Sequence, residues 1–162
     1  MKTSLKVIAC MAALAVLMVA LSASAQGKLQ GVWKITEIAI TGPKPLTITN
    51  PQPSLMIFTE KYFSTTYVTS DQPRPDQPLE KATDAQKLAV WTSFMAFAGT
   101  YEVKGTSMTI HSAVAKNPED MKPGNLSIFD FIIERNTLFL TFKATKEGPR
   151  TNPMTFKMVR VE

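Results

Sequence analysis

The chain has 162 residues, of which 44% are hydrophobic and 19% charged, and a formal net charge of +5. This length suits one domain with a real hydrophobic core, and the weak, scattered positive charge argues against a nucleic-acid-binding protein. The single cysteine, Cys10, lies in the apolar opening of the chain, so the rest of the sequence has no disulfide, thiol nucleophile or cysteine metal site.

The first 25 residues have the pattern of a cleaved secretory signal. Lys2 and Lys6 precede an apolar run from 7 to 21, and small residues follow it up to an A-x-A site at Ala25. Cleavage after Ala25 removes both lysines and lowers the net charge to about +3. We therefore expect an exported protein, either periplasmic or secreted.

Two other interpretations of this segment are a retained membrane anchor and lipidation at Cys10. The apolar run is short for a membrane span and is followed at once by small polar residues. Lipidation at Cys10 would leave most of the apolar run on the mature chain, which does not fit a lipoprotein signal. The predicted mature domain is therefore residues 26–162, with no stable membrane span.

The mature chain divides into short apolar segments separated by turn residues. Stretches rich in Pro, Gly, Asn and Asp at 41–45, 50–53, 71–78 and 117–124 predict loops. Eight segments have the β-branched and aromatic composition of strands: 32–40, 54–59, 62–68, 100–104, 107–114, 126–134, 137–143 and 154–161.

One helix is predicted to begin at Thr83. Thr83 and Gln86 match a capping box, in which each side chain bonds the other residue's backbone N–H. Leu88, Trp91 and Met95 follow at spacings of three and four and form one apolar stripe. We expect this stripe to cover the core or one end of a sheet, in preference to binding a partner.

Two hairpins can be assigned a register by counting outward from two-residue loops at 105–106 and 135–136. In each hairpin this places large apolar residues together on one face. The predicted facing pairs are Val103 with Met108, Tyr101 with Ile110, Glu102 with Thr109, Thr100 with His111, Ile133 with Leu138, Phe131 with Leu140, Phe129 with Phe142, Glu134 with Thr137, Asp130 with Thr141, and Ile132 with Phe139.

The order of these elements predicts a mainly all-β fold. Eight regularly spaced strands with short turns are typical of a sandwich or a barrel, and meander order favours a single antiparallel up-and-down β-barrel with one short helix. Closure of the barrel removes exposed strand edges. An eight-stranded barrel has room for packed side chains or for one small ligand.

Three motifs resemble the bacterial lipocalin-like domain family. Residues 29–33, LQGVW, resemble its L-x-G-x-W start, and residues 99–105, GTYEVKG, resemble its G-x-Y-x-V-x-G hairpin. Residues 136–140, NTLFL, resemble its D-x-L-x-L turn and strand, and His111 matches a His often found after the hairpin. The resemblance covers residues 28–162 and implies a small barrel that binds a small apolar molecule.

The resemblance also implies how one end of the barrel is closed. In lipocalins an Arg from a late strand covers the Trp of the first strand. The W-x-R pattern of the family's last strand is here Met158-Val159-Arg160, which keeps the Arg. We therefore expect Arg160 to stack on Trp33 and close the barrel, a contact worth about 0.5–2 kcal/mol.

The candidate ligand-binding residues lie on the predicted hairpins. Aromatic and Met side chains there could line a cavity or fill a dry core, and the sequence does not give the interior volume. The predicted ligand-binding residues are Tyr101, Met108, Ile110, His111, Phe129, Phe131 and Phe142.

The main prediction is a non-catalytic binder of a small hydrophobic molecule, with no cofactor and no metal. The mature chain has one His and no nucleophile-elbow, phosphate-loop or dinucleotide motif. One alternative is a cofactor-free isomerase or cyclase that uses His111 with Glu102 or Asp130 as acid and base. Another is a protein-binding or inhibitor module with a large exposed apolar patch and no cavity.

Overall fold

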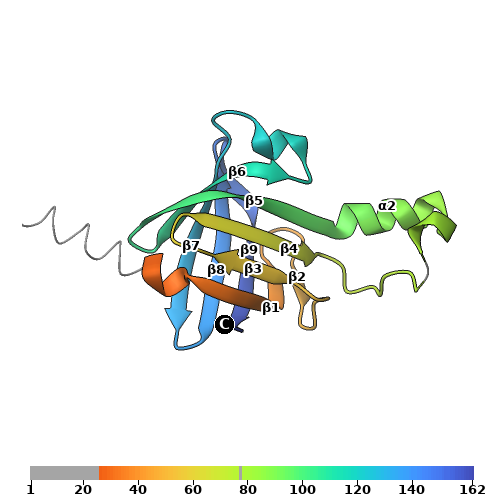
Figure 1. Cartoon of the computed structure of the whole chain (residues 1–162), viewed down its shortest axis with the longest axis horizontal. Coiled ribbons are helices and arrows are strands. Elements are labelled where there is room, and N and C mark those ends of the chain that lie inside the picture. The colour runs from red at the N-terminus through yellow and green to blue at the C-terminus, as the bar shows by residue number, and fades with distance from the viewer. Residues whose placement is uncertain (1–25, 77) are drawn as a thin grey trace, which may run out of the picture.

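The computed structural model describes residues 26–76 and 78–162, so the predicted signal peptide lies outside the described residues. Most of the described chain is antiparallel β-sheet (Figure 1). The strands are β1 (Gly31–Ile40), β2 (Leu46–Ile48), β3 (Leu55–Phe58), β4 (Tyr62–Val68), β5 (Phe94–Lys104), β6 (Ser107–Ala115), β7 (Ser127–Glu134), β8 (Thr137–Thr145) and β9 (Gly148–Arg160). The helices are η1 (Leu79–Lys81), α2 (Asp84–Ser93), η2 (Pro118–Met121) and a short helical segment at 26–29.

The sheet closes into a barrel because β1 pairs with β9. Eight strands complete the circle in the order β1-β3-β4-β5-β6-β7-β8-β9, and β2 is an additional strand that pairs with the second half of β1. The predicted closed up-and-down barrel is therefore confirmed. The ten facing pairs predicted for the β5–β6 and β7–β8 hairpins are all present.

Two strands begin well before their predicted starts, and β2 was not predicted. β5 begins at Phe94 instead of residue 100, and β9 begins at Gly148 instead of residue 154. The early part of β9 contains Pro149 and Pro153, which argued against a strand. It pairs with β8 but extends beyond β1, so the missing proline N–H groups interrupt no ladder on that side.

The prediction that the helix covers the core is wrong. The capping box of Thr83 and Gln86 is present, but α2 buries none of its residues and projects away from the barrel (Figure 1). Leu88 and Trp91 are 64% and 59% exposed. The helix ends at Ser93, and Met95, the third member of the predicted stripe, lies in β5 with strand geometry. The stripe is therefore split between a helix and a strand.

Lys116, at the end of β6, holds the end of α2 against the barrel. Its ammonium donates hydrogen bonds to the carbonyl oxygens of Trp91, Thr92 and Phe94, and lies 5.0 Å from the centre of the Trp91 ring. These bonds satisfy carbonyl groups that a helix end leaves without partners. No helix among residues 26–76 and 78–162 has both the length and the apolar character needed to cross a membrane.

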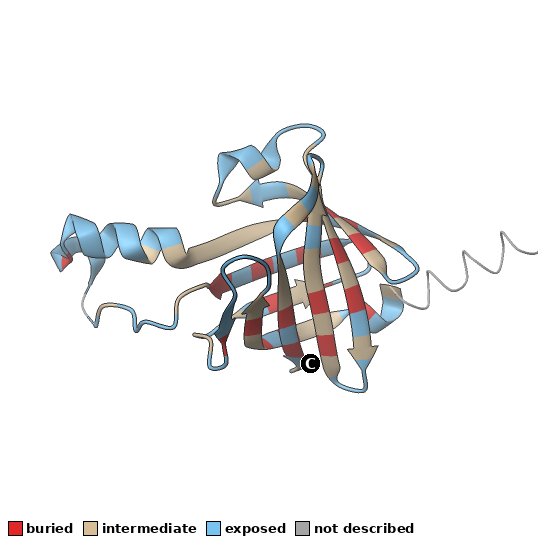
Figure 2. Ribbon diagram, turned by 180° about the vertical axis from the view of Figure 1, so that it is seen from behind, coloured by how far each residue is buried: buried red, intermediate tan, exposed pale blue. Residues whose placement is uncertain are grey.

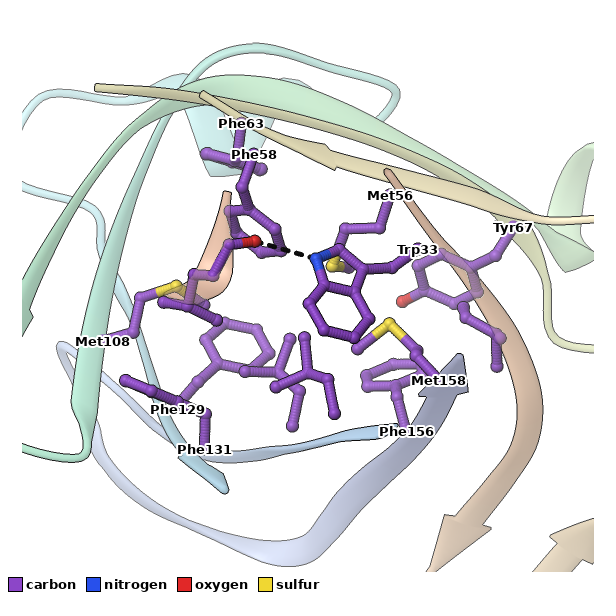
Figure 3. Packing of buried hydrophobic residues seen from close by; sticks show 14 of the residues in the cluster. Trp33, Met56, Phe58, Phe63, Tyr67, Met108, Phe129, Phe131, Phe156 and Met158 are labelled. Carbon is purple, nitrogen blue, oxygen red and sulfur yellow. Dashed lines mark hydrogen bonds between the residues drawn. The ribbon is translucent and has the colours of Figure 1, made fainter. Parts of the chain in front are cut away.

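Apolar side chains pack inside the barrel. Buried residues recur at every second position along the strands, as the alternating bands in Figure 2 show. Trp33 is fully buried, and Met56, Phe58, Met158 and other core side chains surround it (Figure 3). Each of the eight barrel strands contributes buried apolar side chains, and Thr65 is a buried polar residue among them.

Candidate ligand-binding site

One end of the barrel is closed by the motif that opens β1. The Arg160 guanidinium lies 4.2 Å from the centre of the Trp33 indole, so the predicted stack is present. Arg160 also donates hydrogen bonds to the carbonyl oxygens of Lys28 and Gln30, at 2.6 and 2.5 Å. The Trp33 indole N–H donates to the carbonyl oxygen of Leu29 at 2.8 Å. Trp33 is thus fixed from both sides.

Gly31 makes this close packing possible. Its φ is +127°, and a Cβ at this position would lie 2.4 Å from Arg160 Nη1 and 2.5 Å from the carbonyl oxygen of Glu162. A side chain therefore cannot fit without moving the arginine or the backbone of the last residue. Each named position of the L-x-G-x-W pattern has a structural role: Leu29 and Trp33 are buried plugs, and Gly31 leaves room for Arg160.

A cavity of about 330 Å³ opens at the other end of the barrel. The register of β8 with β9 places Thr137 opposite Val159, near Arg160, and Thr145 opposite Gly148, near the cavity mouth. The apolar wall consists of Met56, Tyr67, Met95, Phe97, Ile110, Leu126, Phe129, Phe142 and Phe156. The polar lining consists of Ser112, Asn117, Glu119, Asp120, Asn125, Ser127, Thr145, Glu147 and Arg150.

Aromatic contacts hold the cavity wall in place. Phe129 stacks on Phe142 with ring centres 4.8 Å apart. Tyr67 packs edge-to-face against Phe156 at 5.2 Å and against Phe97 at 6.4 Å. Such pairs have preferred geometries and add to the energy of burial. The wall therefore contains two groups of packed rings, contributed by the five strands β4, β5, β7, β8 and β9.

Tyr67 contributes a polar group to this apolar wall. The residue is 6% exposed, and its hydroxyl makes no hydrogen bond with any described residue. Figure 3 shows its ring directed into the barrel. Burial raises the pKa of the Tyr67 hydroxyl, while the charge of Arg150 lowers it and that of Asp120 raises it. The hydroxyl therefore stays protonated and can donate a hydrogen bond.

Arg150 lies at the cavity mouth. Its guanidinium is 4.2 Å from the centre of the Phe142 ring, and its Nε donates to the carbonyl oxygen of Asn152 at 3.4 Å. The ion pairs found among the described residues do not include Arg150. Its two terminal nitrogens are thus free to donate to a bound molecule.

The carboxyl groups at the cavity mouth differ from one another in their partners. Glu119 forms an ion pair with Lys122 at 2.5 Å, which lowers the pKa of the glutamate. Asp120 accepts a long hydrogen bond of 3.5 Å from Asn117. Burial, and then the charge of Glu119, raise the pKa of Asp120. Of the three acids in the lining, Glu119 is paired with a lysine, and Asp120 and Glu147 take part in no ion pair among the described residues.

Of the predicted ligand-binding residues, Ile110, Phe129 and Phe142 line the cavity. Three others, Tyr101, Met108 and Phe131, are buried in the core outside the cavity lining. The Tyr101 hydroxyl donates to the carbonyl oxygen of Thr59 at 2.6 Å and so already has a partner. The inward alternation was thus assigned correctly, but the depth of each residue along the barrel was not available from the hairpin patterns.

The predicted acid–base residues do not meet in the cavity. Met108, Ile110 and Ser112 face inward from β6, so His111 lies on the outward alternation, and it is not part of the cavity lining. Glu102 is exposed, and Asp130 forms a 2.5 Å ion pair with Lys143. The part of the chain that the structure describes also contains no group of three or more His, Cys, Asp or Glu side chains placed to hold a metal.

Several cavity residues were missed by sequence reasoning. Tyr67 lies two and four positions after the buried Thr65 and Phe63, so the alternation of β4 could have identified it. Met95 and Phe97 were missed because the helix was extended into β5. Arg150 lies in the early part of β9 and Asp120 in η2, and the approach of these segments to the mouth depends on how the barrel closes.

The fold and the site define a class of protein: a closed antiparallel β-barrel with one plugged end and an apolar cavity open at the other. Comparisons of the chain with known protein families, with curated proteins and with solved structures find no match. The case for a function therefore rests on the chemistry and shape of the cavity.

Proposed function

We propose that this protein is an exported, lipocalin-like carrier or receptor that binds a small hydrophobic molecule without catalysis. The observation that supports this most directly is the cavity of about 330 Å³ with its aromatic and methionine wall. Ligand sites of small molecules are typically about 300–1,000 Å³, mostly apolar, with a few polar groups at defined positions. The cavity lies at the lower end of this range.

The volume of the cavity limits the size of the ligand that can bind. A volume of about 330 Å³ corresponds to roughly ten water-sized groups, which suits a short acyl chain or a small ring system better than a large sterol or a haem. Met56 and Met95 are flexible side chains that can adapt to such a molecule. The cavity also argues against the protein-binding alternative, which requires a barrel without one.

The test is a pair of phenylalanine substitutions on β6. Ser112 lines the cavity, and Ala113 next to it is exposed. We expect Ser112→Phe to fill the cavity and to weaken binding of the neutral fluorescent probe N-phenyl-1-naphthylamine by at least about tenfold, whereas Ala113→Phe leaves it unchanged. Fluorescence titration measures both.

A panel of fatty acids, isoprenoids and aromatic compounds then competes with the probe. Equal probe affinity in the two variants would place binding outside the barrel. Failure of the wild-type protein to bind the probe and every compound of the panel would refute the proposed function. Native mass spectrometry of protein purified without denaturation would show a ligand that remains bound.

A further inference from the structure

We infer that the ligand is an amphipathic carboxylic acid, whose apolar tail lies in the barrel and whose carboxylate accepts hydrogen bonds from Arg150 and Tyr67. This inference rests on the proposed function and names the chemical class of its ligand. Two hydrogen-bond donors line the cavity, the Tyr67 hydroxyl in the wall and the terminal N–H groups of Arg150 at the mouth. Neither makes a hydrogen bond with a described residue.

The first donor is the Tyr67 hydroxyl. The residue is buried, but its hydroxyl lines the cavity and makes no hydrogen bond with any described residue, so it can still donate to a bound molecule. Tyr67 is held by rings on both sides, Phe156 at 5.2 Å and Phe97 at 6.4 Å, and this packing restricts the directions in which its hydroxyl can seek another partner. A ligand oxygen would supply the missing acceptor.

The second donor is the Arg150 guanidinium. It stacks on Phe142, a residue of the cavity wall, so it borders the same space as Tyr67. Stacking fixes the guanidinium plane and leaves the terminal N–H groups at its edge, where a planar carboxylate can accept two parallel hydrogen bonds. Tyr67, Arg150 and Asp120 all belong to the lining of this cavity.

Three acids, Glu119, Asp120 and Glu147, also line the mouth and bear on the charge of the ligand. Glu119 is already paired with Lys122, and burial raises the pKa of Asp120. An ammonium group at this position would face the unpaired Arg150 charge. Ionised Asp120 would weaken carboxylate binding, so this residue is expected to limit the affinity for the ligand.

The experiment compares three ten-carbon probes that differ in the polar end: decanoate, 1-decanol and decylamine. Each competes with N-phenyl-1-naphthylamine at low salt for the wild-type protein and for four variants. Arg150→Gln and Tyr67→Phe remove the donors, and Asp120→Asn removes the opposing charge. Arg135→Gln is the matched control, because Arg135 is an exposed turn residue between β7 and β8.

We expect the wild-type protein to prefer decanoate to decanol by at least about tenfold, and decylamine to bind least. Arg150→Gln should weaken decanoate about tenfold, and Tyr67→Phe by roughly three- to tenfold, with decanol affected less than threefold in Arg150→Gln. Asp120→Asn should strengthen decanoate by roughly two- to fivefold, and Arg135→Gln should change nothing.

Equal binding of decanoate and decanol, or an Arg150→Gln variant that keeps the wild-type preference, would overturn the inference. Either result would leave the proposed function intact if Ser112→Phe still blocks N-phenyl-1-naphthylamine. A preference for decylamine that is lost in Asp120→Asn would likewise refute a carboxylate ligand. Thermal melting of each variant checks that the fold is retained, which we expect because neither donor's side chain forms an ion pair with another described residue.

Discussion

At the scale of single residues, the two ends of the barrel have opposite requirements. At the closed end, Trp33 is fully buried, its indole N–H donates to the carbonyl oxygen of Leu29, and Arg160 donates to those of Lys28 and Gln30. At the open end, the Tyr67 hydroxyl lacks a partner among the described residues. The first arrangement favours rigidity, and the second leaves bonding capacity for a ligand.

Gly31→Ala should destabilise the protein by about 1–3 kcal/mol. The change combines a positive φ, which L side chains rarely adopt, with a Cβ only 2.4 Å from Arg160 Nη1. Gly27→Ala is the control, because a Cβ at Gly27 meets nothing within 4 Å. Urea unfolding followed by circular dichroism measures both. Equal stabilities of the two variants would contradict the role assigned to Gly31.

Thr65→Val should stabilise the protein by about 1 kcal/mol. Thr65 is 1% exposed, and its hydroxyl has no hydrogen-bond partner among the described residues. Valine keeps the branched shape that suits a strand and removes the buried polar atom. Thr66→Val on the exposed face of the same strand is expected to change the free energy of unfolding by less than about 0.5 kcal/mol. A loss of stability in Thr65→Val would show that the hydroxyl has a partner, such as a buried water.

At the scale of elements, α2 stands apart from the barrel. The helix begins at the capping box of Thr83 and Gln86, and Lys116 donates hydrogen bonds to carbonyl oxygens at its end. No residue of the helix is buried. The helix is therefore stabilised by its termini instead of by an apolar face. The strand that follows it, β5, carries Met95 and Phe97, which line the cavity.

Leu88→Ser should change the free energy of unfolding by less than about 0.5 kcal/mol, because Leu88 is 64% exposed. Leu138→Ala is the comparison, since Leu138 is fully buried, and it should cost about 2–5 kcal/mol. Chemical denaturation distinguishes these outcomes. A large loss in Leu88→Ser would show that α2 packs against the barrel in solution.

At the scale of the whole molecule, local periodicity was enough to predict the hairpin registers but not how deep each residue lies in the barrel. The alternation along β5 to β8 was sufficient for the register of both hairpins, because a two-residue turn fixes which side chains face each other. The same patterns could not show that Phe129 borders the cavity while Phe131 belongs to the core. That distinction depends on the distance of each residue from the mouth, which is set by all eight strands together.

The composition of the mouth was even less accessible from the sequence. Asp120, Arg150 and Tyr67 are separated by tens of residues and lie on η2, β9 and β4. Only closure of the barrel brings them to one opening. The helix was misjudged for a related reason: its periodic stripe continued into Met95, although the chain changes to strand geometry at Phe94.

The pairing of β1 with β9 has a consequence for how the molecule folds. Contacts such as that of Trp33 with Arg160 join residues from opposite ends of the domain, so the chain must form its least local pairing to complete the sheet. Proteins rich in such contacts fold slowly, in milliseconds to seconds. Until β9 docks, β1 and β8 each present an open edge that can pair with another chain. The final strand thus ends the period in which this protein is most prone to aggregate.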